Sequence, residues 1–231
     1  MALVLHGGVK VEYSLFKDRT DAGRKLAQRL IHYAGRRNVI VLALPRGGVP
    51  VGNEVAKALD VPLDIFLVRK LGSPGQEELA MGAIASGGIR VLNEDVVKLL
   101  VIRQDEIERV AAREQQELAR REHVYRGDRP MPVLRDQTII LVDDGLATGT
   151  TMRAAVVAIR SQRPERIVVA VPTAPRETCQ KFENEVDEII CATTPEHFRA
   201  LGEWYEDFRQ TTDEEVRSLL GKASGQIHGV G

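Results

Sequence analysis

The sequence predicts an α/β fold of three layers, in which helices flank a central, mostly parallel sheet, with a small C-terminal hood added. Two observations predict it. Runs of consecutive apolar residues, such as 39–44 and 139–142, are typical of strands that are buried on both faces. Segments with helical spacing follow these runs, so strand and helix alternate along the chain. In folds of this class, ligands bind at the carboxyl ends of the strands.

The predicted elements follow this alternation. The first is an amphipathic helix that begins at a cap, either Asp18 or Thr20. Asn93 is expected to cap a long helix whose charges describe a solvated face. In order, the elements are a helix at 18–37, a strand at 39–44, a helix at 51–59, a strand at 62–68, a loop at 69–78, a short strand at 81–86, a helix from 93 to about 121, a strand at 139–142, a helix around 152–159, and strands at 166–171 and 186–191.

Composition describes a soluble protein with one core of good size, because the 231 residues are 43% hydrophobic and 28% charged. The net charge of -1 and the aromatic content of 4% give no support to nucleic-acid binding. The apolar start at 1–5 is too short for a signal sequence or a membrane span, so a cytoplasmic protein without a membrane partner is expected. Cys179 and Cys191 lack metal-ligand spacing and are expected to be reduced, small apolar fillers.

The segment 139–151 joins a buried strand to two carboxylates and to a turn of small residues that opens a helix. Backbone N–H groups at the start of that helix can surround a phosphate, and Gly149 lets the backbone approach it closely. Asp143 and Asp144 can accept hydrogen bonds from vicinal ribose hydroxyls, directly or through a hydrated divalent cation. An ordinary strand-to-helix turn is the alternative. The residues expected around the ribose and its 5-phosphate are Asp143, Asp144, Ala147, Thr148, Gly149, Thr150 and Thr151.

This segment resembles the phosphoribosyl-pyrophosphate signature of type I phosphoribosyltransferases, which is a hydrophobic strand, two acidic residues, a short variable piece and then Thr-Gly-x-Thr. Arg46, Gly47 and Gly48 look like the turn that binds pyrophosphate after the first core strand of that family. Taken alone, these three residues would indicate only a permissive turn with an exposed arginine. Beside the signature, they are expected to bind the pyrophosphate.

The segment that starts at Arg69 and Lys70 resembles the mobile lid that closes over the pyrophosphate in this family, with a solvated charged loop as an equal alternative. The resemblance implies an enzyme that transfers ribose 5-phosphate from phosphoribosyl pyrophosphate (PRPP) to a nitrogen nucleophile and releases pyrophosphate. In the family the anomeric carbon develops oxocarbenium character, so Mg2+, Arg46 and one of Arg69 or Lys70 would neutralise the leaving group. Asp143 and Asp144 would hold the sugar and the metal ion, directly or through water.

The acceptor stays open. The 6-oxopurine enzymes carry a basic Asp at the place of Ala147, which argues against hypoxanthine or guanine, and the lid departs from that of the orotate enzymes after Lys70. The chain most resembles the uncharacterised bacterial branch of the family, through its segments at 44–51 and 142–149. Aromatic residues of the hood could form a stacking wall for a planar base, with Tyr205 as the candidate contact, or an anchor that ties the tail to the core.

A non-catalytic protein that senses PRPP or nucleotides in the same pocket is the alternative function. A dinucleotide-binding protein is a weaker alternative, because no Gly-x-Gly-x-x-Gly follows a strand. Small molecules are the expected partners, together with a second copy of the chain, since the family often forms dimers. The expected regions are an N-terminal extension at 1–16, the phosphoribosyltransferase core at 17–192, the hood or anchor at 193–220 and a disordered tail at 221–231.

Overall fold

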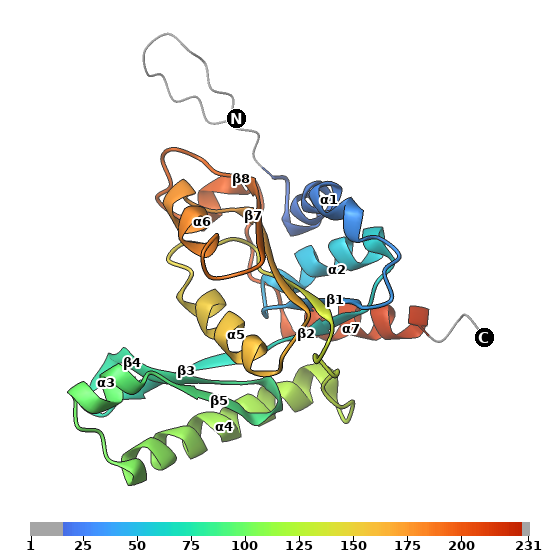
Figure 1. The fold of residues 1–231 in the computed structure, drawn as a ribbon. Coiled ribbons are helices and arrows are strands. Elements are labelled where there is room, and N and C mark those ends of the chain that lie inside the picture. The colour runs from blue at the N-terminus through green and yellow to red at the C-terminus, as the bar shows by residue number, and fades with distance from the viewer. Residues whose placement is uncertain (1–15, 228–231) are drawn as a thin grey trace.

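A five-stranded sheet in the order β2-β1-β6-β7-β8 forms the centre of the molecule (Figure 1), in a computed structural model that describes residues 16–227. Every neighbouring pair of these strands is parallel, which confirms the predicted class of fold. All residues of β1 and β6 are buried, as expected of strands covered on both faces. The strands are β1 (Val39–Ala43), β2 (Leu63–Ile65), β6 (Thr138–Val142), β7 (Arg166–Thr173) and β8 (Glu188–Thr193).

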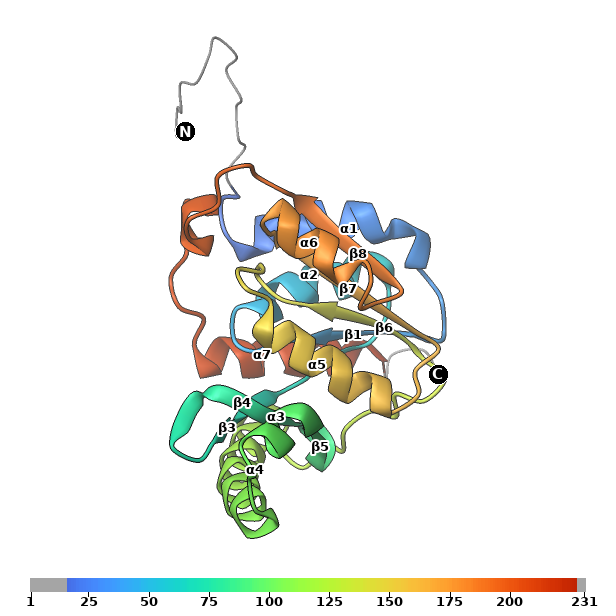
Figure 2. The same ribbon diagram turned by 60° about the vertical axis from the view of Figure 1, so that its left-hand side comes forward.

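Helices cover both faces of this sheet, as Figure 2 shows, and a separate apolar cluster fills the space on each side. Val41 belongs to one cluster and its neighbour Leu42 to the other, because successive side chains of a strand point to opposite faces. No helix within the described residues is long and apolar enough to span a bilayer. The helices are α1 (Arg19–Leu30), α2 (Gly48–Leu59) and α7 (Asp213–Ile227) on the first side, and α5 (Thr150–Ser161) and α6 (Arg176–Phe182) on the second.

Helix α1 is shorter than predicted, since it ends at Leu30 and a 3-10 turn, η1 (Ile31–Tyr33), follows. Asp18 is its cap, because Oδ1 of Asp18 accepts a hydrogen bond from the Asp21 N–H at 2.7 Å.

The residues 68–126 form a second unit, which we call the arm and which lies below the core in Figure 1. Its antiparallel sheet has the order β3-β4-β5, and two helices follow the sheet. Helix α4 packs along β3 and β4, and α5 of the core contacts all three arm strands. The arm consists of β3 (Val68–Ser73), β4 (Gln76–Ala85), η2 (Ser86–Gly88), β5 (Ile89–Leu92), α3 (Glu94–Leu99) and α4 (Gln104–Arg126).

The prediction of a loop at 69–78 is wrong, because most of this segment belongs to the hairpin of β3 and β4. A Cβ atom on Gly72 would lie 2.7 Å from the carbonyl oxygen of Glu77, so the residue that suggested a loop instead permits close pairing of the two strands.

The prediction of a single helix from 93 to about 121 is also wrong. It is two helices, because Val101 between them adopts a left-handed φ of 51°. The predicted cap is confirmed, since Oδ1 of Asn93 accepts a hydrogen bond from the N–H of Val96 at 3.3 Å.

The C-terminal segment returns to the core through a 3-10 turn, η3 (Leu201–Trp204), and then enters α7. The expectation of disorder from residue 221 is wrong as far as Ile227, where α7 ends, because Val216 and Leu220 on this helix are buried in the first apolar cluster. Residues 1–15 of the expected N-terminal extension at 1–16, and the last four residues, 228–231, lie outside the described residues.

Cys179 of α6 and Cys191 of β8 form a disulfide, so the prediction of free thiols is wrong. Helix α6 folds back beside β8 and thereby joins two residues that are 12 positions apart in the sequence. Because persistent disulfides are rare in a reducing cytosol, the cysteines no longer support a cytoplasmic location, which stays a prediction.

Candidate active site

Two loops meet at the carboxyl ends of β1 and β6, which are neighbours in the sheet. The N–H of Leu44 donates to the carbonyl oxygen of Val142 at 2.9 Å. A Cβ atom on Gly47 would lie 1.9 Å from Oδ2 of Asp144, and one on Gly48 would lie 2.7 Å from the carbonyl oxygen of Val142. Only glycine fits at these two positions. The structure therefore brings the predicted pyrophosphate turn and the predicted acidic pair into direct contact.

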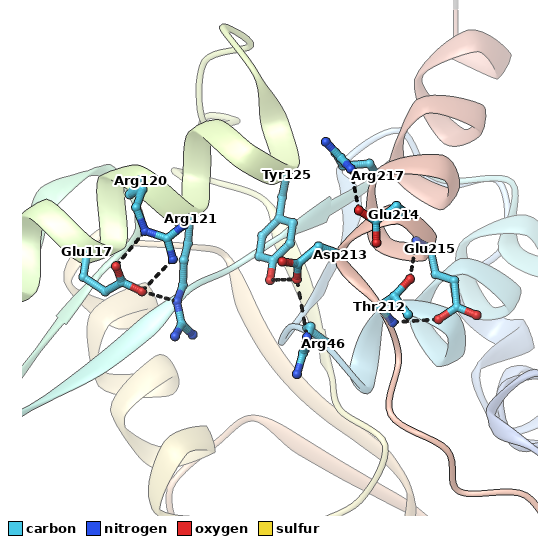
Figure 3. A network of polar contacts seen from close by, with 10 residues as sticks. All are labelled: Arg46, Glu117, Arg120, Arg121, Tyr125, Thr212, Asp213, Glu214, Glu215 and Arg217. Carbon is cyan, nitrogen blue, oxygen red and sulfur yellow. Dashed lines mark hydrogen bonds and ion pairs between the residues drawn. The ribbon is translucent and has the colours of Figure 1, made fainter.

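Arg46 precedes the two glycines and follows a cis peptide bond from Pro45. Its Nη1 lies 3.6 Å from Oδ1 of Asp213 at the start of α7, and the hydroxyl of Tyr125, near the end of α4, donates to the same oxygen at 2.7 Å. Figure 3 shows these three side chains converging from the turn before α2, from α4 and from α7. Burial and then the hydrogen bond to Asp213 raise the pKa of Tyr125 to about 12, so the phenol is a neutral donor. The sequence reasoning missed both Tyr125 and Asp213.

Asp143 is half-buried directly after β6. Its Oδ1 accepts a hydrogen bond from the backbone N–H of Asp144 at 2.8 Å. Burial, followed by the charge of Asp144, raises the pKa of Asp143 well above its ordinary value. The two carboxylates are thus close enough to repel each other, which is an arrangement that favours a nearby cation.

Asp144 is buried and is held at two points. Nε of Arg19, from the first turn of α1, lies 2.8 Å from Oδ2 of Asp144. The hydroxyl of Tyr205 donates to the backbone carbonyl oxygen of Asp144 at 2.6 Å. Sequence reasoning missed Arg19, which lies in a polar first helical turn where charges are usually solvated.

The predicted phosphate loop opens α5. Gly149 has a φ of 74°, and a Cβ atom there would lie 2.6 Å from the ring of Phe182 on α6, so both the backbone and the packing require glycine. The first N–H groups of α5 have no partner within the helix and are available to an anion. The side chains of Ala147, Thr148, Thr150 and Thr151 are exposed at this end of the helix.

Two core side chains hold the carbonyl groups of this loop. Oγ1 of Thr178 on α6 donates to the carbonyl oxygen of Ala147 at 3.0 Å, and Nη1 of Arg153 on α5 donates to that of Thr148 at 2.9 Å. The shape of the loop therefore depends on α6, which the disulfide joins to β8.

Arg69 and Lys70 lie on β3 of the arm rather than on a core loop. Nε of Arg69 lies 2.5 Å from Oε2 of Glu114 on α4. Glu114 is buried and also binds Arg113. Because side chains alternate along a strand, Lys70 points to the opposite face of β3. The structure thus gives Arg69 a partner within the arm, whereas Arg46 stands in the turn next to Gly47, which faces Asp144.

Tyr205 anchors the C-terminal segment. Its side chain is 5% exposed, and its ring lies 5.4 Å from that of Phe16 and 5.0 Å from that of Phe208. Burial also raises its pKa. Tyr205 and its neighbour Trp204 are buried in one apolar cluster, as the anchor interpretation expects, and an acceptor contact of Tyr205 stays a prediction.

Within residues 16–227, no cluster of three or more His, Cys, Asp or Glu side chains has the arrangement of a metal site. Asp143 and Asp144 still supply oxygen ligands of the kind that Mg2+ prefers, and Mg2+ usually binds proteins through one or two carboxylates together with water and substrate phosphates.

Comparison with known proteins agrees with this geometry. A family model described as the phosphoribosyl transferase domain matches residues 14–202. Two Mycobacterium tuberculosis proteins, from strains CDC 1551 / Oshkosh and H37Rv, carry names that assign them provisionally as phosphoribosyl transferases. Each is 46% identical over 209 residues, which is 90% of this chain and 47% of the relative. The chain therefore spans about half the length of these curated relatives.

A solved structure shares this fold. The crystal structure of TT1426 from Thermus thermophilus has a TM-score of 0.81 and 40% sequence identity, covering 90% of this chain and 98% of that chain.

Proposed function

This chain belongs to the phosphoribosyl transferase family, and on that premise we propose that it is an enzyme that transfers ribose 5-phosphate from PRPP to a nitrogen acceptor and releases pyrophosphate. One observation carries the proposal, namely the contact between Gly47 and Asp144, where a Cβ atom would lie 1.9 Å from the carboxylate. In PRPP the pyrophosphate is bonded to C1 of the ribose. A protein that binds one group with each of two turns must therefore hold the two turns side by side.

Each group of the donor has a proposed binding region. The N–H groups at the start of α5 bind the 5-phosphate. Asp143 accepts hydrogen bonds from the ribose hydroxyls, and Arg46 with the amides of Gly47 and Gly48 binds the pyrophosphate. The bond from C1 of the ribose to the pyrophosphate oxygen breaks, the acceptor nitrogen forms the new bond to C1, and its proton leaves to a base. The protein contributes position and charge compensation at the leaving group.

We propose Mg2+ as the metal partner of the reaction. When bound, Mg2+ neutralises charge on the departing pyrophosphate. Asp143 would hold it through water, and Asp144, whose Oδ2 is engaged by Arg19, would add negative charge beside it.

Phosphorus NMR tests the activity directly. The protein is incubated with PRPP, Mg2+ and, one at a time, purine bases, pyrimidine bases, ammonia and aliphatic amines. We expect pyrophosphate and a new ribose 5-phosphate ester with one of these acceptors, and neither product with Asp143→Asn. PRPP that persists unchanged with every acceptor, at the rate of a protein-free control, would contradict the proposed transfer.

A further inference from the structure

The carboxylate of Asp144 is enclosed, although it stands next to the residue proposed to face the sugar. The side chains of Arg19 and Asp144 are only 10% and 12% exposed, and their Nε and Oδ2 atoms lie 2.8 Å apart. The same Oδ2 atom faces Gly47, whose missing side chain makes room for it. Asp144 therefore lies between α1 and the pyrophosphate turn, where its Oδ2 is engaged by Arg19.

Arg19 is fixed on three sides. Besides the bond from Nε to Asp144, Nη1 donates to the carbonyl oxygen of Arg209 at 2.7 Å. The guanidinium carbon lies 4.0 Å from the centre of the Phe208 ring. A planar guanidinium can make two directed hydrogen bonds and stack on an aromatic face at once, which the ammonium group of a lysine cannot do.

Three parts of the chain thus converge on Asp144. Arg19 comes from α1, Tyr205 from the C-terminal segment and Gly47 from the pyrophosphate turn. Asp143 has a different environment, because its Oδ1 accepts only a local backbone hydrogen bond among the described contacts, and its side chain is half-buried.

We infer that Arg19 is a positioning residue that holds the Asp144 carboxylate against Gly47, so that Asp144 joins the two loops while Asp143 alone faces the ribose. The inference deepens the proposed function and rests on it for the identity of the ligands. It divides two adjacent aspartates into a structural member and a ligand-binding member.

Arg24 provides a matched control on the same helix. Its Nε lies 3.0 Å from Oε2 of Glu54, so it also joins α1 to a carboxylate of another element. Its side chain is 69% exposed, however, and an exposed ion pair contributes little. The variants Arg19→Gln and Arg24→Gln therefore remove the same charge from the same helix and differ in what the arginine holds.

Hydrogen–deuterium exchange measured by mass spectrometry tests the positioning role without any ligand. We expect Arg19→Gln to raise exchange in peptides that cover 44–50 and 142–149, with the arm peptides unchanged, and Arg24→Gln to match the wild type throughout. Asp143→Asn should lower the affinity for PRPP and leave exchange in both loops unchanged. Adding Asp144→Asn to Arg19→Gln should return exchange part of the way to wild type, because no buried charge is then left unpaired.

Calorimetric titration of PRPP with Mg2+ accompanies the exchange experiment. Arg19→Gln should bind at least tenfold more weakly than Arg24→Gln. Equal exchange in both loops for the two arginine variants would overturn the inference, as would a rise spread over the whole chain. If the wild type binds no PRPP, the proposed function fails, and the exchange data still decide whether Arg19 holds the two loops.

Discussion

The core and the arm both contain arginine–carboxylate pairs, and one pair from each region shows how widely their exposure can differ. In the pair of Arg19 and Asp144 the side chains are 10% and 12% exposed, whereas in the pair of Arg120 and Glu117 on α4 they are 63% and 31% exposed. Removing one partner of a buried pair leaves an uncompensated charge, which is strongly destabilising, while an exposed pair contributes little. The charges of the core loops can thus fix a site, and most charges on α4 keep the arm solvated.

The comparison is sharpest between two arginines that the sequence placed in the same role. Arg46 lies in the turn beside Gly47, and Arg69 lies on β3 of the arm with Glu114 as its partner. Both arginines have a carboxylate partner, but Arg46 pairs with Asp213 at 3.6 Å, whereas Arg69 lies 2.5 Å from Glu114. Arg46 also stands at the carboxyl ends of the core strands, so it is the better placed of the two for the pyrophosphate.

The largest effect is expected from Arg46→Ala. It should lower the rate of pyrophosphate release on the order of a hundredfold, or about 3 kcal/mol, and leave nucleoside monophosphate binding nearly intact. Arg69→Ala is the matched control in the arm and should have a much smaller effect, since Glu114 keeps Arg113 at 3.0 Å. Both are measured by product assay and by calorimetry with a nucleoside monophosphate. If Arg46→Ala lowered the rate of pyrophosphate release and the affinity for the nucleoside monophosphate equally, our assignment of this turn to the pyrophosphate would be wrong.

The disulfide gives the core a covalent connection between α6 and β8. Replacing Cys179 and Cys191 by serine should lower the free energy of unfolding by about 2–3 kcal/mol, because the unfolded chain is no longer cross-linked over 12 positions. Urea denaturation checks this, and wild type treated with a reductant should then match the variant. A titration that finds two free thiols in the untreated protein would contradict the bond.

Gly149 and Gly75 offer a comparison at the same backbone φ. Both have a φ of 74°, but a Cβ atom on Gly149 would lie 2.6 Å from Phe182, whereas one on Gly75 in the arm hairpin would have nothing within 4 Å. Gly75→Ala should cost about 1 kcal/mol of stability from the left-handed backbone alone. Gly149→Ala should cost more and should also weaken binding of ribose 5-phosphate. Similar stability and binding in the two variants would contradict our account of the phosphate loop.

The smallest effect concerns the joint between the arm and the core at Tyr125 and Asp213. The pKa of Tyr125 is raised to about 12, compared with about 10 for an unfolded tyrosine. Between these values the unfolded phenol loses its proton first, so stability falls as the pH rises from about 10 to 12. In Tyr125→Phe the free energy of unfolding should fall by about 1 kcal/mol less than in the wild type over this pH range. Urea denaturation at several alkaline pH values measures it, and identical slopes for variant and wild type would contradict the role of Tyr125.

The core was readable from the sequence because its strands are short, continuous apolar runs, which only burial on both faces explains. Once the strands were placed, the meeting of the segments after residues 44 and 142 followed from the parallel sheet. The strands of the arm could not be predicted in the same way. β3 contains Arg69, Lys70 and Gly72, so it lacks an apolar strand pattern and forms a strand through its pairing with β4.

The contacts that complete the site could not be predicted from local sequence patterns either, because they join residues far apart in the chain. Arg19 is 125 positions from Asp144, and Tyr205 is 61 positions from it. Neither belongs to a motif with a fixed spacing, so only the folded chain shows that they surround the second aspartate. The cysteines are closer in sequence, but their pairing depends on α6 folding back beside β8.

Calorimetric titration of PRPP with Mg2+ tests the central claim, that the donor binds where the two core loops meet. The titration compares the wild type with the double variant Asp143→Asn, Asp144→Asn and with Arg69→Ala as the control in the arm. We predict micromolar binding by the wild type and by the arm variant, and loss of binding in the double aspartate variant. Absence of binding in the wild type, or unchanged binding in the double variant, would contradict the account.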